Sequence, residues 1–119
     1  VRDCLHPRDL GPVIESQLAD PASSSRPKIV NLSGGVANSM SLAQLSSWCR
    51  DRLGPSHSEF HISNSPLAEN RPFDIPWMVL DTTLASTTWD WRPATPISRI
   101  LEEIVQHAEA NPAWLDLVT

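Results

Sequence analysis

The chain has 119 residues, 40% of them hydrophobic and 19% charged, which fits one globular domain and excludes a disordered segment. Fourteen acidic residues against nine basic ones give a net charge of −5. This acidic balance argues against a nucleic-acid-binding module, which normally carries a basic stripe. No apolar run approaches the ~20 residues of a membrane helix, so we expect no membrane association.

The first predicted helix follows an extended stretch at residues 1–5. If Asp9 is its N-cap, Pro12 falls in the first turn, where the missing backbone N–H costs no helical hydrogen bond. Asp20 and the proline after it would end the helix. The apolar residues on the predicted inner face are Val13, Ile14 and Leu18.

Residues 28–33 are rich in β-branched and apolar side chains and predict a strand, which ends at the glycine pair 34–35. Those glycines suit a tight turn with unusual backbone angles. A second helix follows, because Ser41 and Gln44 form a capping box and Gly54 marks a stop. Its apolar stripe comprises Leu42, Leu45, Cys49 and Leu53.

The second half of the chain begins with a proline-containing loop at residues 64–76, followed by an apolar run at 77–80 that predicts a buried extended segment. Asp81 is placed to cap a short helix over residues 82–88. Trp89 and Trp91 flank a turn, and we favour core anchoring for both over stacking on a ligand.

The last helix is predicted to start at Thr95, with Pro96 in its first position, and to end at Asn111. Its apolar residues recur at the spacing of one helical face. They are Ile97, Ile100, Leu101, Ile104, Val105 and Ala108.

Few residues offer reactive chemistry. Cys4 and Cys49 are too few for a disulfide framework, and no Cys/His pair has metal-ligand spacing. We therefore expect reduced thiols, a cytoplasmic protein and no metal site. The sequence holds no tyrosine and begins with Val1, and we expect it to be a fragment of a longer protein.

Three motifs occur in a fixed order: R-D-x-L-H-x-x-D-L at residues 2–10, N-L-S-G-G-x-x-N-S at 31–39, and R-x-x-D at 71–74. In this order they resemble the C-terminal portion of the NAD-dependent sugar epimerase/dehydratase family, the extended short-chain dehydrogenases. The first two motifs are most similar to the CDP-paratose (CDP-tyvelose) 2-epimerase branch.

The resemblance implies an α/β fold without the Rossmann nucleotide-binding part. Residues 1–33 would form a strand-helix-strand unit that completes the sheet of a larger domain, and residues 34–119 a small helical lobe. The family's glycine-rich turn and Tyr-x-x-x-Lys pair are missing here. NAD and the catalytic residues would therefore belong to an N-terminal Rossmann domain, the expected partner of this chain, and this chain would supply no catalytic residue.

The resemblance also implies a site for a nucleoside diphosphate sugar. Arg2 and Arg71 would hold the diphosphate, because arginine forks bind phosphate oxygens well, and Asp74 would accept the ribose hydroxyls. The alternatives are an ion pair of Arg2 with Asp9 or another acid, a solvated Arg71 and an ordinary turn role for Asp74. Asp3 and His6 are expected to tie the strand end to the following helix.

Two functions remain open at this stage. The first is the nucleotide-sugar-binding part of an NAD-dependent epimerase, for which the sequence names neither the nucleotide, the sugar nor the inverted carbon, and does not separate epimerase from dehydratase. The second is a stand-alone, non-catalytic binding or protein-interaction module with the same fold. In either case, uncovered apolar faces predict a homo-oligomer.

Overall fold

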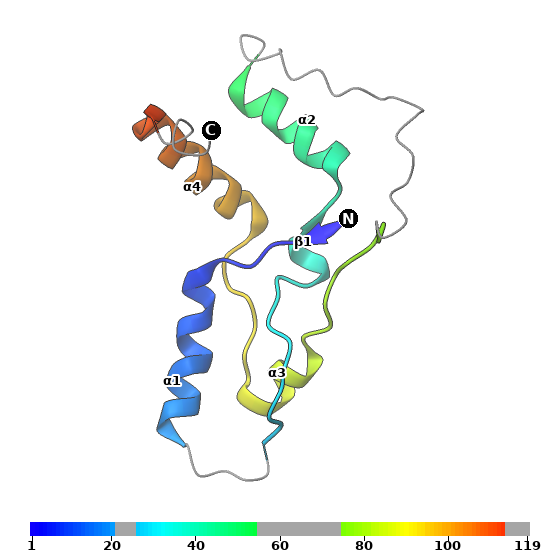
Figure 1. Cartoon of the computed structure of the whole chain (residues 1–119), viewed down its shortest axis with the longest axis vertical. Coiled ribbons are helices and arrows are strands. Elements are labelled where there is room, and N and C mark those ends of the chain that lie inside the picture. Colours follow the sequence, from blue (N-terminus) through cyan, green and yellow to red (C-terminus); the bar gives the residue numbers. More distant parts are fainter. Residues whose placement is uncertain (21–25, 55–74, 114–119) are drawn as a thin grey trace. The chain divides into compact units, whose positions relative to one another are not determined.

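The computed structural model describes residues 1–20, 26–54 and 75–113 of the chain. Figure 1 shows its order: β1 (Arg2–Asp3), α1 (Gly11–Ala19), β2 (Ser39–Met40), α2 (Leu42–Leu53), α3 (Thr83–Trp89) and α4 (Ile97–Ala110). Short 3-10 helices span Pro7–Leu10 and Val36–Asn38. The only sheet in the described ranges is the antiparallel pair β1–β2, so this part of the chain is mostly helical and matches the expected α/β class only loosely.

The chain divides into two compact units. The first unit comprises Val1–Arg2 and Met40–Met78, and the second unit comprises Asp3–Ser39 and Val79–Thr119. The first unit contains α2, and the second contains α1, α3 and α4. No helix in the described part of the chain is long and apolar enough to cross a membrane.

The start of α1 differs from the prediction. His6 caps the preceding 3-10 helix, its Nδ1 accepting the Arg8 N–H at 3.0 Å, and Asp9 turns inward instead of capping. Pro12 does fall in the first turn, as predicted. Val13 is buried, but Ile14 and Leu18, predicted for the core, are 50% and 73% exposed, because α1 buries only a narrow strip of its surface.

The predicted strand at residues 28–33 is wrong as a hydrogen-bonded strand. Within it, Val30 and Leu32 pack on the core and Ile29 between them is 84% exposed, whereas Lys28 is exposed and Ser33 is buried. A strand needs a neighbouring backbone to form a ladder, and no described residue provides one. The turn that follows is as expected, since Gly35 has φ +67°.

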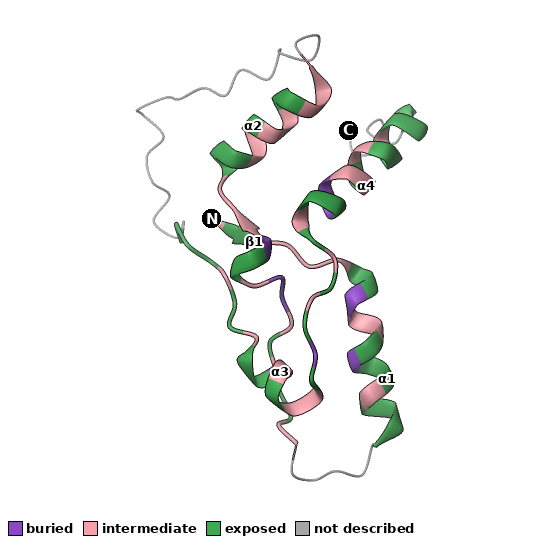
Figure 2. Ribbon diagram, turned by 180° about the vertical axis from the view of Figure 1, so that it is seen from behind, coloured by how far each residue is buried: buried purple, intermediate pink, exposed green. Residues whose placement is uncertain are grey.

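In the first unit, α2 begins and ends where the sequence predicts. Ser41 and Gln44 form both hydrogen bonds of the capping box, at 3.1 and 2.7 Å, and Gly54 ends the helix with φ +75°. Its predicted apolar stripe is only half-buried, and Leu42 is 80% exposed. Figure 2 accordingly shows no buried residue along α2.

The core of the second unit is small. Its buried members are Val13, Ala85 and Trp91, and the half-buried residues around them are Leu5, Val30, Leu32 and Trp89. Trp91 is therefore a core anchor, as predicted, and its indole N–H donates to the Asp9 carbonyl at 2.6 Å. Trp89 also packs against this core.

The starts of α3 and α4 lie close to the positions that the sequence predicts. Asp81 accepts bonds from the Thr83 N–H and hydroxyl at 2.9 and 2.6 Å and so holds the start of α3, although Thr82 and not Asp81 occupies the N-cap position. The N-cap of α4 is Pro96 rather than Thr95. Ile100 and Leu101 are buried as expected, whereas Ile104, on the same predicted face, is 50% exposed.

The apolar run at residues 77–80 is predicted to be buried, but in the structure it is largely exposed. Trp77, Met78 and Leu80 are 56%, 42% and 43% exposed. Met78 forms one isolated parallel bridge with Arg2, so the run has no extended ladder to support it.

Candidate functional site

Arg2 is the only one of the three predicted binding residues that lies in the described ranges; Arg71 and Asp74 lie outside them. Arg2 is exposed, and its Nη1 donates to the carbonyl oxygens of Val1 and Ile75, each at 2.8 Å. Its guanidinium thus contacts the residue that directly follows the R-x-x-D motif in the sequence.

The backbone reinforces this contact within the first unit. The Met78 N–H donates to the Val1 carbonyl at 3.0 Å, in addition to the bridge between Arg2 and Met78. Two segments more than 70 positions apart are therefore joined by main-chain and side-chain hydrogen bonds. Apart from the family resemblance, no local pattern in the sequence indicates this pairing.

Asp9, one of the acids considered as an ion-pair partner of Arg2, forms its hydrogen bonds within the second unit. It is 6% exposed, and its carboxylate accepts three hydrogen bonds: from the Thr95 hydroxyl at 2.7 Å, the Thr95 N–H at 3.0 Å and the Ala94 N–H at 3.1 Å. Burial raises the pKa of Asp9, but the hydrogen bonds from Thr95 and Ala94 outweigh it and leave the pKa below its ordinary value. Asp9 is therefore an ionised structural anchor.

Asp3 joins the first two motifs to each other. Its Oδ2 accepts hydrogen bonds from the Ser33 hydroxyl and, at 2.9 Å, from the Gly35 N–H. The turn at this point is tightly packed, because a Cβ atom on Gly34 would overlap the carbonyl group of Cys4. Asp3 thus holds the glycine turn. The prediction that it holds the helix after residues 1–5 is wrong.

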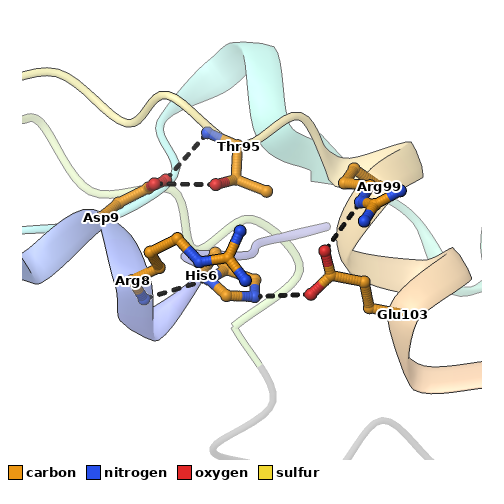
Figure 3. A network of polar contacts seen from close by, with 6 residues as sticks. All are labelled: His6, Arg8, Asp9, Thr95, Arg99 and Glu103. Carbon is orange, nitrogen blue, oxygen red and sulfur yellow. Dashed lines mark hydrogen bonds and ion pairs between the residues drawn. The ribbon is translucent and has the colours of Figure 1, made fainter. Parts of the chain in front are cut away.

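His6 links the start of the first helical segment to α4, as Figure 3 shows. Its Nε2 lies 3.0 Å from Glu103 Oε2, and Arg99 Nε donates to Glu103 Oε1 at 2.7 Å. Since Nδ1 accepts the Arg8 N–H, the neutral ring carries its proton on Nε2 and donates it to Glu103. Both ring nitrogens are engaged, so His6 has a structural role and is not placed to act as a general base.

The contacts of Glu103 with Arg99 and His6 also lower the pKa of its carboxyl group. The hydrogen bond from Arg99, and then that from His6, stabilise its carboxylate and keep its pKa below the ordinary value.

Among the residues that the structure describes, no group of three or more His, Cys, Asp or Glu side chains is placed to hold a metal ion. Cys4 and Cys49 are half-buried free thiols.

Asn38 is a key residue that sequence reasoning did not identify. Its Oδ1 accepts the Ile97 N–H at 3.0 Å, and its Nδ2 donates to the Thr95 carbonyl at 2.8 Å. It therefore caps α4 from a position almost 60 residues away. The only available signal was its place in the N-L-S-G-G-x-x-N-S motif, which does not reveal the partner.

Comparison of the chain with protein-family models, curated proteins and solved structures finds no match.

Proposed function

We propose that this chain is the nucleotide-sugar-binding C-terminal part of an NAD-dependent nucleotide-sugar epimerase similar to the CDP-sugar 2-epimerases. Its substrate would be a nucleoside diphosphate sugar. The catalytic Tyr/Lys pair and the NAD site would belong to an N-terminal Rossmann domain outside these 119 residues. NAD supplies hydride abstraction and return at a sugar carbon in that reaction, while this chain binds and orients the substrate.

One observation carries the proposal. The resemblance assigns the diphosphate to arginines in two motifs that lie far apart in the sequence, at residues 2–10 and 71–74. In the first unit, Arg2 of the first of these motifs contacts the residue that directly follows the second. Arg2 Nη1 donates to the Ile75 carbonyl at 2.8 Å, and Ile75 follows Asp74 in the chain. A contact of this kind is what a shared phosphate site requires, because both arginines must reach one ligand.

The chemistry of the three residues suits such a ligand. Two guanidinium groups supply charge-assisted, bidentate hydrogen bonds to phosphate oxygens. A carboxylate at Asp74 accepts hydrogen bonds from both hydroxyls of a ribose. The polar groups of the second unit do not compete for this role, because Asp3, His6 and Asp9 are engaged in holding the fold.

The test is calorimetric titration of CDP, UDP and dTDP into the chain. Arg71→Ala is the informative variant, because Arg2 also holds the Ile75 carbonyl and its removal would mix two effects. We expect Arg71→Ala to weaken binding about 10- to 100-fold, the value of a charge-assisted contact. Arg92→Ala, an exposed arginine in the second unit, is the matched control and should leave the affinity unchanged.

A second comparison tests the ribose contact. The unmodified chain should bind CDP more tightly than dCDP, and Asp74→Ala should reduce that preference about tenfold, because a hydrogen bond from the 2′-hydroxyl is lost. Equal affinities of Arg71→Ala and Arg92→Ala for every nucleotide would refute the proposed site. That result would favour the alternative of a non-catalytic interaction module.

A further inference from the structure

Trp77 is a large aromatic side chain that lies open to solvent in the first unit, where it is 56% exposed. Its neighbours Ile75 and Met78 are 51% and 42% exposed, so the ring is part of a continuous apolar run. The other tryptophans of the described ranges are buried or half-buried; these are Trp48, Trp89 and Trp91. An exposed apolar run of this kind marks a binding surface.

Hydrogen bonds on both sides of Trp77 hold its backbone in place. Two residues before it, the Ile75 carbonyl accepts from Arg2 Nη1 at 2.8 Å. Directly after it, the Met78 N–H donates to the Val1 carbonyl at 3.0 Å, and Met78 also forms the parallel bridge with Arg2. An exposed ring on a backbone that is already fixed loses little conformational entropy when it binds a ligand.

We propose that Trp77 is the surface on which the base of the nucleotide sugar stacks. This inference rests on the proposed function, because it names the base contact of the same site. In a nucleoside diphosphate a single ribose separates the base from the diphosphate, so the groups that bind the two must lie close together. The Arg2 guanidinium meets this condition, because it bonds the carbonyl two residues before Trp77.

Stacking on Trp77 would add affinity without selecting the base. Every base has a π-face, so aromatic side chains stack on all of them with similar strength. The arginines of the site would supply the charge-assisted bonds to the diphosphate, and the ring would supply apolar contact at the other end of the nucleotide. If the exposed ring instead contacted a protein surface such as the N-terminal domain, its removal would leave nucleotide affinity unchanged.

The test is calorimetric titration of CDP, UDP, dTDP and inorganic pyrophosphate into the 119-residue chain. Trp77→Leu removes the ring and should weaken all three nucleotides by a similar factor of about 10. It should leave the affinity for pyrophosphate unchanged, because pyrophosphate has no base. Trp77→Phe keeps an aromatic face and should recover most of the affinity. Leu42→Ala, at a position 80% exposed on α2 of the same unit, is the matched control and should bind normally.

Tryptophan fluorescence locates the base directly. CDP should quench the emission of the natural chain, and pyrophosphate should not. Trp77→Phe should still bind CDP but lose most of this quenching, because the ring that contacts the base no longer emits at tryptophan wavelengths. Circular dichroism and the thermal midpoint establish that each variant is folded.

The results distinguish this inference from the proposed function. If Arg71→Ala weakens nucleotide binding and Trp77→Leu does not, the stacking surface is refuted and the proposed site stands. An equal loss of nucleotide and pyrophosphate affinity in Trp77→Leu would also overturn the inference, because the ring would then support the phosphate site and not the base. If no nucleotide binds the natural chain, both proposals fail.

Discussion

The Asp9 carboxylate offers the most direct test of what holds the second unit together. Asp9→Ala removes all three of its hydrogen bonds and leaves the N–H groups of Ala94 and Thr95 without their acceptor. Each charge-assisted bond is worth roughly 1.5–3 kcal/mol, but these partners are only part-buried and water would replace some of the loss. We therefore expect the free energy of unfolding to fall by about 3–4 kcal/mol.

Asp9→Asn separates charge from shape. An amide oxygen at the Oδ2 position still accepts both backbone N–H groups, and the Thr95 hydroxyl can rotate to accept from the amide NH₂. All three hydrogen bonds survive without their ionic character, so the cost should be only about 1 kcal/mol. Glu15→Ala, at an exposed position on α1, is the control and should change stability by less than about 0.5 kcal/mol.

The assay is urea unfolding followed by circular dichroism, with stabilities compared at a common denaturant slope. It should be repeated from neutral pH into acid. Because the folded pKa of Asp9 is lowered, its stabilisation is present above the unfolded value of about 3.9 and is lost as the pH falls through the folded pKa. The difference between the natural chain and Asp9→Asn should therefore shrink below about pH 4. Equal stability of Asp9→Ala and Glu15→Ala would refute the reasoning.

Two further changes test the turn and the cap by thermal unfolding. Gly34→Ala should lower the free energy of unfolding by about 2–4 kcal/mol, because its Cβ would overlap the Cys4 carbonyl. Gly11→Ala, with nothing within 4 Å of its added Cβ, should raise it by up to about 1 kcal/mol. Equal thermal midpoints of the two variants would contradict this. Asn38→Ala should cost about 2 kcal/mol through loss of the Ile97 cap. Asn38→Asp keeps the acceptor but loses the donor to the Thr95 carbonyl, so it should recover only part of that loss; an Asn38→Ala midpoint equal to that of the natural chain would exclude the capping role.

Local signals in the sequence were sufficient to predict the ends of several helices. The capping box at the start of α2 needs only Ser41 and Gln44, which are three positions apart, and the stop at Gly54 needs only its own positive φ. Asp81 likewise reaches only as far as Thr83. Such features depend on neighbours in the chain, so the sequence contains everything that determines them.

Long-range partners were not predictable in this way. Asp9 was expected to cap a helix because aspartate commonly does so, yet its acceptor atoms are used by Ala94 and Thr95, more than 80 positions away. Asn38 likewise caps α4 from a position 59 residues before Ile97 in the sequence. A polar side chain that could cap a nearby helix can equally bond to a distant segment. Only the tertiary structure reveals which of these two roles it takes.

Apolar periodicity was informative about faces but not about burial. The pattern of α4 identified Ile100 and Leu101, which are buried, and with equal force Ile104, which is half-exposed. Ile14 and Leu42 show the same discrepancy. A stripe states which residues would be covered if an element packed against them, and the described ranges do not contain enough elements to cover every stripe.

The motif residues fall into two groups that have different value as evidence for function. Most of them hold the second unit together, so their presence is explained by packing and hydrogen bonding alone; these are Asp3, His6, Asp9, Gly34 and Asn38. A resemblance carried by such residues is mainly a resemblance of fold. Arg2 is different, because its guanidinium bonds the carbonyl oxygens of Val1 and Ile75 in the first unit, and Arg71 and Asp74 lie outside the described residues. The proposed function therefore depends on these three, and the nucleotide titration of Arg71→Ala is the experiment on which it should be judged.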